Sequence, residues 1–176
     1  MRSTFLAFCS VASLLLVGAT QAHAQDSWDV NVSAAYMDFD LSGTGQTGGV
    51  AVRAKRALTS GFVLELGSTF ARPCQQFQDC KTTGPASLFT PEAQLQYHWG
   101  LGRVEPYVGA GLGASALRSS LQTDWEPTVS FAGGTAVRLT DQLALTGEFR
   151  LRGHEWKFTG TTTEISVGLA WRFPTF

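Results

Sequence analysis

Apolar and polar residues alternate along most of the chain. In the stretch TEISVGLAWRF, residues 163–173, Ile165 and Val167 fall on one face of an extended strand, whereas Glu164 and Arg172 fall on the other. No segment after residue 24 repeats its apolar residues with the 3.6-residue period of an amphipathic helix. The pattern therefore predicts an all-β chain in which each strand has one apolar face.

The alternation recurs often enough for eight strands. They are expected at 28–40, 47–58, 61–71, 87–99, 104–119, 127–140, 143–158 and 163–173. Tight turns are expected at 58–61, 100–103 and 140–142, and more variable, mostly longer connections at 41–46, 72–86, 119–126 and 159–162. Short turns at one end and longer loops at the other predict an eight-stranded antiparallel up-and-down transmembrane β-barrel.

Alternation alone does not show which face is outside, because a soluble lipocalin-like barrel also alternates, with its apolar face inward. Only 15% of the residues are charged, against about 25% in soluble domains, and glycine, alanine and serine dominate the polar face. The lumen of an eight-stranded barrel is just wide enough for its own side chains. These features favour an apolar face that meets lipid, and a soluble periplasmic binder is the least favoured alternative.

Aromatic residues lie toward the ends of the expected strands, as the two interfaces of a bilayer require. On the short-turn side they are Trp28, Tyr97, Trp99, Trp171 and Phe173, and on the loop side Phe39, Phe70, Phe89, Trp156 and Phe158. Two aromatic girdles are therefore predicted.

The charged residues expected on the inward face include as many acids as bases. The acids are Asp29, Glu65, Glu92, Glu105, Glu148 and Glu164, and the bases are Arg53, Lys55, Arg138, Arg150, Arg152 and Arg172. Because confined charges need partners, we expect an ionic network that plugs the lumen. Neighbouring strands suggest pairing of Glu65 with Arg53 or Lys55, of Glu105 with Arg138, of Glu164 with Arg150 or Arg152, and of Asp29 with Arg172.

The beginning of the chain has the pattern of a secretory signal peptide. Arg2 precedes the apolar run 5–17, and Ala22-His23-Ala24 fits a cleavage site of the A-x-A type. The run is too short for a transmembrane anchor. The predicted domains are a signal peptide at 1–24 and an outer-membrane barrel domain at 25–176.

Cys74 and Cys80 are the two cysteines that follow the signal peptide, in the polar stretch RPCQQFQDCKTTGP. In an exported chain this context predicts a local disulfide. Metal binding is the competing interpretation, but two cysteines without a nearby histidine make a poor zinc site. We expect no metal and no cofactor.

The segments PYVGAGLGAS and VGLAWRF, together with the eight-strand plan, resemble the small outer-membrane β-barrel family, which includes OmpA/OmpX-type barrels and opacity-protein surface antigens. The resemblance implies a bacterial outer-membrane location, outer-membrane lipid around the barrel, and the barrel-assembly machinery as a partner during biogenesis. That machinery reads a terminal aromatic residue, for which Phe173 and Phe176 are both candidates.

The expected function is non-enzymatic: a plugged barrel, expected to be monomeric, that acts as a structural protein or surface antigen through its loops. A narrow porin-like passive channel is one alternative. The other is a lipid A-modifying enzyme, for which His98 and His154 are the candidate bases, although the serine that follows the histidine in lipid A deacylases is replaced by Glu155 and Trp156. A nucleic-acid partner is not expected, because the net charge is −1 and basic residues are not clustered.

Overall fold

The computed structural model describes residues 27–39, 46–59, 61–72, 87–118 and 123–174. These residues form eight strands: β1 (Ser27–Phe39), β2 (Thr47–Thr59), β3 (Phe62–Ala71), β4 (Ser87–His98), β5 (Val104–Arg118), β6 (Thr123–Arg138), β7 (Leu143–His154) and β8 (Lys157–Pro174). No helix among the described residues is long and apolar enough to cross a membrane.

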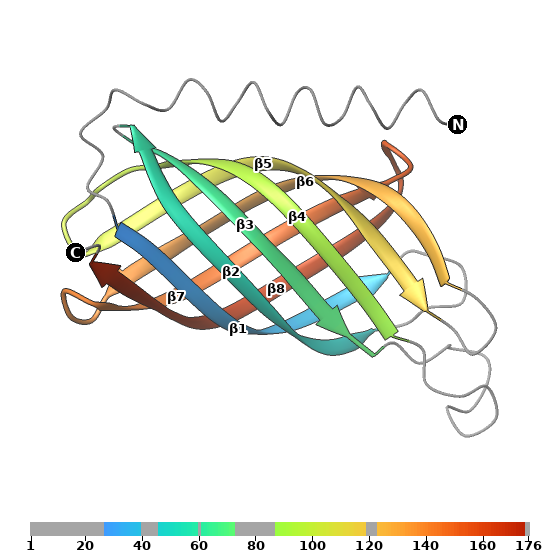
Figure 1. Cartoon of the computed structure of the whole chain (residues 1–176), viewed down its shortest axis with the longest axis horizontal. Coiled ribbons are helices and arrows are strands. Elements are labelled where there is room, and N and C mark those ends of the chain that lie inside the picture. Colours follow the sequence, from blue (N-terminus) through green and yellow to red (C-terminus); the bar gives the residue numbers. More distant parts are fainter. Residues whose placement is uncertain (1–26, 40–45, 60, 73–86, 119–122, 175–176) are drawn as a thin grey trace.

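The strands follow one another around a closed barrel, in which every neighbouring pair is antiparallel (Figure 1). The barrel closes between β1 and β8, where Ser33 pairs with Gly168 and Ala35 with Ser166. Because both edges of the sheet are paired at this seam, none of the eight strands leaves an open row of backbone donors and acceptors. The start of β1 and the end of β8 lie together at the end of the barrel with the short turns.

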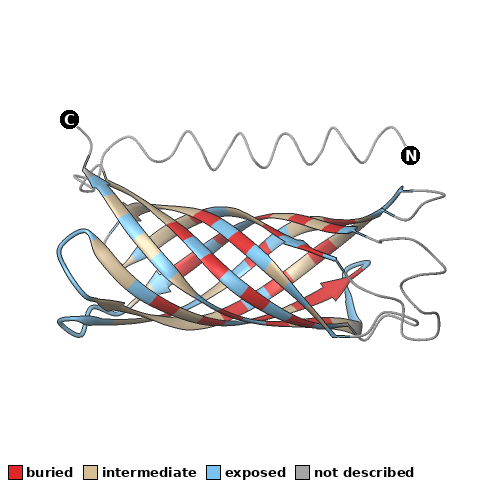
Figure 2. Ribbon diagram, turned by 90° about the horizontal axis from the view of Figure 1, so that it is seen from below, coloured by how far each residue is buried: buried red, intermediate tan, exposed pale blue. Residues whose placement is uncertain are grey.

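The barrel is polar inside and apolar outside. In the middle of the barrel, buried residues alternate with exposed or half-buried ones along the strands (Figure 2). Val32 is 53% exposed, whereas Glu164 on the neighbouring β8 is fully buried. Large apolar side chains on a soluble protein would lie inside. The inverted arrangement therefore confirms the predicted barrel with an apolar outer face.

Aromatic side chains gather at both ends of the outer face. At the short-turn end, Tyr97 contacts Phe62 and Trp99, each with ring centroids 5.1 Å apart. At the loop end, Phe70 stacks on Phe89 with centroids 4.8 Å apart. The structure does not describe the side chain of Phe39.

The last loop-side connection differs from the expected loop at 159–162. The chain turns at Glu155 and Trp156, both with positive φ, and β8 already begins at Lys157. Positive φ at both central residues is the type I′ geometry that suits a two-residue hairpin. Phe158 then stacks on Phe131 of β6, with centroids 5.7 Å apart, which holds this end of β8 against the barrel. Trp156 therefore lies in the turn and not within a strand.

Two further boundaries differ from the sequence analysis. β7 ends at His154 instead of continuing to 158, and β6 begins at Thr123 instead of 127. Pro127 has no N–H to donate to the sheet. Its carbonyl accepts a hydrogen bond from Glu155 N at 2.9 Å, and the residue is paired with Ala114, so β6 continues through it.

Three predictions lie outside the described residues: the signal peptide at 1–24, the disulfide between Cys74 and Cys80, and the role of Phe176.

Candidate functional site in the barrel lumen

Three arginines and four glutamates cross the lumen, and we call them the ionic network. They are Arg53, Arg150, Arg152, Glu65, Glu92, Glu148 and Glu164. All seven side chains are buried, and they come from β2, β3, β4, β7 and β8. The ammonium of Lys55 lies 3.2 Å from Glu65 Oε2 and brings the set to four positive and four negative charges.

Arg150 occupies the centre of this network. Its Nη2 donates to Glu65 Oε1 at 2.5 Å and its Nη1 to Glu92 Oε2 at 3.0 Å. Its Nε donates to Glu148 Oε1 at 2.9 Å on the same strand. One guanidinium on β7 thus binds carboxylates on β3 and β4, which are not neighbours of β7 in the barrel. These contacts span the lumen.

Arg152 and Arg53 complete the ring of contacts. Arg152 donates to Glu92 at 2.6 Å and to Glu164 at 2.7 Å. Arg53 pairs with Glu164 and lies 3.3 Å from Glu148 Oε1. Each of the four carboxylates contacts two guanidiniums. Buried charges are tolerated when each has partners of opposite sign, and this ring supplies them.

Glycines make room for the long side chains that lie across the sheet. A Cβ added to Gly113 would come within 2.6 Å of Glu92 Cγ. One added to Gly134 would come within 2.6 Å of the hydroxyl of Tyr107. The glycines that weaken β5 as an isolated strand are therefore explained by large neighbours that cross close to the backbone.

Tyr107 lies beside the ionic network on the short-turn side. Its hydroxyl donates to Glu148 Oε2 at 2.8 Å. The ammonium of Lys55 lies 4.2 Å from the centroid of its ring, and the His98 ring stacks on it at 4.8 Å with an interplanar angle of 12°. Gln96 donates to Glu65 at 2.9 Å. Together these side chains form a layer across the lumen.

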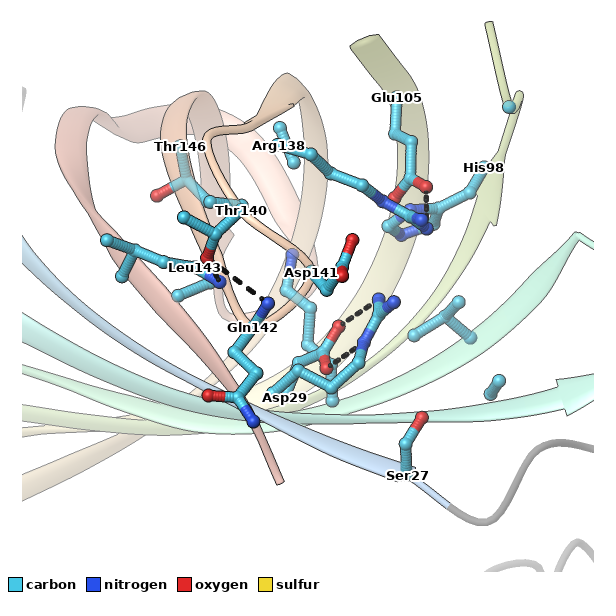
Figure 3. Close-up of a pocket in the computed structure, with 18 of the residues that line it drawn as sticks. Ser27, Asp29, His98, Glu105, Arg138, Thr140, Asp141, Gln142, Leu143 and Thr146 are labelled. Carbon is cyan, nitrogen blue, oxygen red and sulfur yellow. Dashed lines mark hydrogen bonds and ion pairs between the residues drawn. The ribbon is translucent and has the colours of Figure 1, made fainter. Parts of the chain in front are cut away.

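A vestibule of about 550 Å³ opens beyond this layer at the short-turn end (Figure 3). His98 and Lys55 belong to its lining. At its rim, Arg172 binds both carboxylate oxygens of Asp29, at 2.8 and 2.9 Å, and Arg138 pairs with Glu105. The vestibule is therefore a recess at the short-turn end with two ion pairs at its rim.

A small apolar cluster lies at the loop end of the lumen, and we call it the apolar cap. Met37, Ala71 and Leu88 are buried there and pack with the half-buried Leu117. This cap lies on the opposite side of the ionic network from the vestibule, because along β4 Leu88 precedes Glu92 of the network, whereas His98 of the vestibule lining follows it.

His154 lies at the same end between a carboxylate and a hydroxyl. Its Nε2 lies 2.8 Å from Thr162 Oγ1, and its Nδ1 lies 3.4 Å from Glu126 Oε2. Among the described residues, no group of three or more His, Cys, Asp or Glu side chains is placed to hold a metal ion.

The expected ion pairs between neighbouring strands are all present: Glu65 with Arg53 and Lys55, Glu105 with Arg138, Glu164 with Arg152, and Asp29 with Arg172. They fall into two places. Asp29, Glu105, Arg138 and Arg172 lie at the vestibule rim, apart from the ionic network.

Sequence reasoning left Tyr107, Gln96 and Met37 out of the site. Tyr107 had a signal: it is an inward aromatic residue whose register partner on β6 is the inward Gly134. An aromatic ring opposite a glycine can lie flat over the sheet. Met37 had no such signal. A methionine on the inward face near a strand end does not by itself indicate that it packs in a buried apolar cluster.

A family model described as outer membrane protein beta-barrel domain matches residues 9–173. The comparison with curated protein sequences finds no match.

Solved structures of small outer-membrane barrels have the same fold. Neisserial surface protein A is 16% identical with a TM-score of 0.60, covering 85% of this chain and 98% of that one. OprG from Pseudomonas aeruginosa is 10% identical with a TM-score of 0.62, covering 88% and 99%. The N-terminal barrel of OprF from Pseudomonas aeruginosa is 16% identical with a TM-score of 0.54, covering 86% and 100%. The chain belongs to the outer-membrane β-barrel family and is a protein of the bacterial outer membrane.

Proposed function

We propose that this protein is a non-enzymatic envelope barrel with a plugged lumen, which acts as a structural or surface-exposed protein through its loops. The observation that carries the proposal is the ionic network. Four carboxylates and three guanidiniums meet across the lumen, and every carboxylate contacts two guanidiniums. A charge-selective pore would line its path with one sign of charge and leave it hydrated.

The apolar cap and the Tyr107 layer support the plug. An ion that entered from the vestibule would have to displace the Tyr107 ring, separate Arg150 from its carboxylates, and then pass the buried Met37 and Leu88. Separating a buried charge from its partners costs several kcal/mol for each ion. Steady permeation is therefore not expected.

The test is planar-bilayer recording of the purified barrel. We expect no stable open state. The matched variant is Arg150→Ala, which removes the central guanidinium, with Arg172→Gln at the rim as the control. A steady conductance of the unaltered protein would overturn the plug. Current through Arg150→Ala, with none through the unaltered protein or Arg172→Gln, would support it.

A lipid A-modifying enzyme is the alternative, and the array Glu126–His154–Thr162 favours it. A carboxylate, an imidazole and a hydroxyl in this order resemble the acid, base and nucleophile of a hydrolase. In this array the hydroxyl of Thr162, which would be the nucleophile, belongs to a residue that is only 1% exposed. The Glu126 side chain, which would be the acid, is 42% exposed. A nucleophile must reach its substrate, so this arrangement suits a structural link, in which His154 of β7 hydrogen-bonds to Thr162 of β8 and lies beside Glu126 of β6.

Mass spectrometry of lipid A distinguishes the two functions. We expect the same acyl and phosphate pattern in cells that produce the protein, in cells that lack it, and in cells that produce Thr162→Val. A change that depends on the protein and disappears in Thr162→Val would establish the enzyme instead.

A further inference from the structure

A continuous aromatic row lies on the outer face at the loop end of β3, β4 and β6. Phe70 stacks on Phe89, with centroids 4.8 Å apart, and Phe89 meets Trp125 edge-on at 6.5 Å. The rings of Phe89 and Trp125 meet across β5 because Ala116, which is paired with both, has only a methyl group. Among the described residues of these strands, no other ring contact on the outer face lies nearer the loops, and we call Phe70, Phe89 and Trp125 the aromatic row.

A second row lies one step closer to the loops on the same face, and we call it the arginine row. Ser87 pairs with Arg118, and Arg118 pairs with Thr123. Arg72 follows Ala71, which pairs with Leu88, so Arg72 is level with Ser87. Each of these four residues is two positions along its strand from an outward residue just described: Phe70, Phe89, Ala116 or Trp125. The two-residue period of a strand therefore places all four on the outer face.

The spacing and charge of the arginine row suit an anion. Arg72 and Arg118 are two strand positions apart, which is about 10 Å, and both are exposed. No ion pair joins either arginine to another residue that the structure describes. The described outward positions of β3 to β6 carry no acidic residue. Glu65, Glu92, Glu105, Asp124 and Glu126 occupy inward positions, and Asp124 is the register partner of Leu117, the residue before Arg118. Among the described outward positions of these strands, the two positive charges therefore have no acidic neighbour.

We propose that the arginine row binds the phosphate groups of an anionic glycolipid in the outer leaflet, while the aromatic row contacts the acyl chains of the same molecule. Guanidinium groups bind phosphate through paired N–H donors, and the hydroxyls of Ser87 and Thr123 supply further donors. The loop end of an outer-membrane barrel faces the exterior. The site therefore lies at the depth where phosphate meets hydrocarbon in the outer leaflet.

The opposite rim supplies a matched control. Arg56 lies on the outer face at the short-turn end, with its guanidinium 5.7 Å from the ring centroid of Trp28, and Arg103 lies exposed in the neighbouring turn. Arg56 and Arg103 have the same charge as Arg72 and Arg118, but they face the inner leaflet. Replacing them changes the net charge equally without touching the proposed site.

Native mass spectrometry of the refolded barrel in zwitterionic micelles tests the proposal. The probes are bisphosphorylated lipid A, dephosphorylated lipid A with the same acyl chains, phosphatidylglycerol, and pyrophosphate. We expect bisphosphorylated lipid A to be retained about 25-fold more than the dephosphorylated form, because each of the two basic residues near an anionic surface contributes roughly a fivefold preference. The variant Arg72→Gln/Arg118→Gln should lose this preference, and Arg56→Gln/Arg103→Gln should keep it.

Heat-dependent gel mobility shows whether each variant is folded, and the comparison of probes on the unaltered protein decides the question even if a variant fails to fold. Equal retention of phosphorylated and dephosphorylated lipid A would overturn the proposal. Equal retention of phosphatidylglycerol would overturn the assignment to a glycolipid, and arginine-dependent retention of pyrophosphate alone would indicate a site for free anions. Loss of the preference in Arg56→Gln/Arg103→Gln would show an effect of net charge only.

Discussion

The two halves of the lumen contain the same kinds of ion pair in different surroundings. In the ionic network, Arg150 and Glu65 are almost completely buried, with side chains 2% and 1% exposed. At the vestibule rim, Arg172 and Asp29 form a bidentate pair with side chains 32% and 28% exposed. Solvent screens the rim pair, whereas the buried pair has no solvent to replace a lost partner. Burial, and not the number of contacts, should therefore decide what each pair contributes.

The largest effect is expected for Arg150→Ala. It leaves Glu65, Glu92 and Glu148 with one fewer guanidinium each, and loss of one partner from a buried charge cluster costs about 3–5 kcal/mol. Urea-induced unfolding of the refolded barrel in lipid vesicles measures the change in the free energy of unfolding. The double variant Arg150→Met/Glu148→Gln, which removes one charge of each sign, should lose less. A loss below about 1 kcal/mol for Arg150→Ala would contradict the importance of burial.

Tyr107→Phe tests the layer between the two halves. The variant removes one hydrogen bond to the Glu148 carboxylate and keeps the ring that stacks on His98. Hydrogen bonds to charged groups contribute about 1.5–3 kcal/mol, and unfolding in urea should show a loss in that range. Tyr36→Phe, on the outer face of β1, is the control and should be close to neutral. Equal effects of the two variants would show that the hydroxyl of Tyr107 has no special role.

Gly134→Ala tests the space beneath the same ring. An added Cβ would lie 2.6 Å from the Tyr107 hydroxyl and would also meet the backbone carbonyl of Gly147, which cannot move freely. Overpacking of this kind costs about 1–3 kcal/mol. Gly147→Ala is the control, because its Cβ would meet nothing within 4 Å. The two variants should differ clearly in urea midpoint, and matching midpoints would argue against close packing of Tyr107 over Gly134.

The smallest effect is expected at the rim. Arg172→Gln breaks the bidentate pair with Asp29, but a partly exposed pair contributes only about 0–1 kcal/mol. The unfolding free energy should fall by no more than that, and raising the salt concentration should reduce the difference. A loss as large as that of Arg150→Ala would remove the contrast between the two halves of the lumen.

The neighbouring-strand ion pairs could be predicted because a hairpin fixes which residues face each other. Lys55 and Glu65 are register partners across the β2–β3 hairpin. Across the last hairpin, Glu164 is the register partner of Arg150 and forms its ion pair with Arg152, two residues further along β7. The contacts of Arg150 with Glu65 and Glu92 join strands that are not neighbours. They depend on the stagger of the whole barrel, which no single hairpin defines. The turn at Glu155 and Trp156 was missed because neither residue has the preference for positive φ that asparagine or glycine gives.

By itself, the sequence determined the eight alternating strands, the inverted distribution of polar and apolar faces, and the inward position of most of the charged residues. These properties depend on the two-residue period of an extended chain, which is local. Only the tertiary structure decided that Arg150 meets three carboxylates, that Tyr107 separates the ionic network from the vestibule, and that Asp29 and Arg172 stay at the rim. Each of these depends on how far the strands are staggered when β1 closes on β8, and closure is a property of the whole barrel.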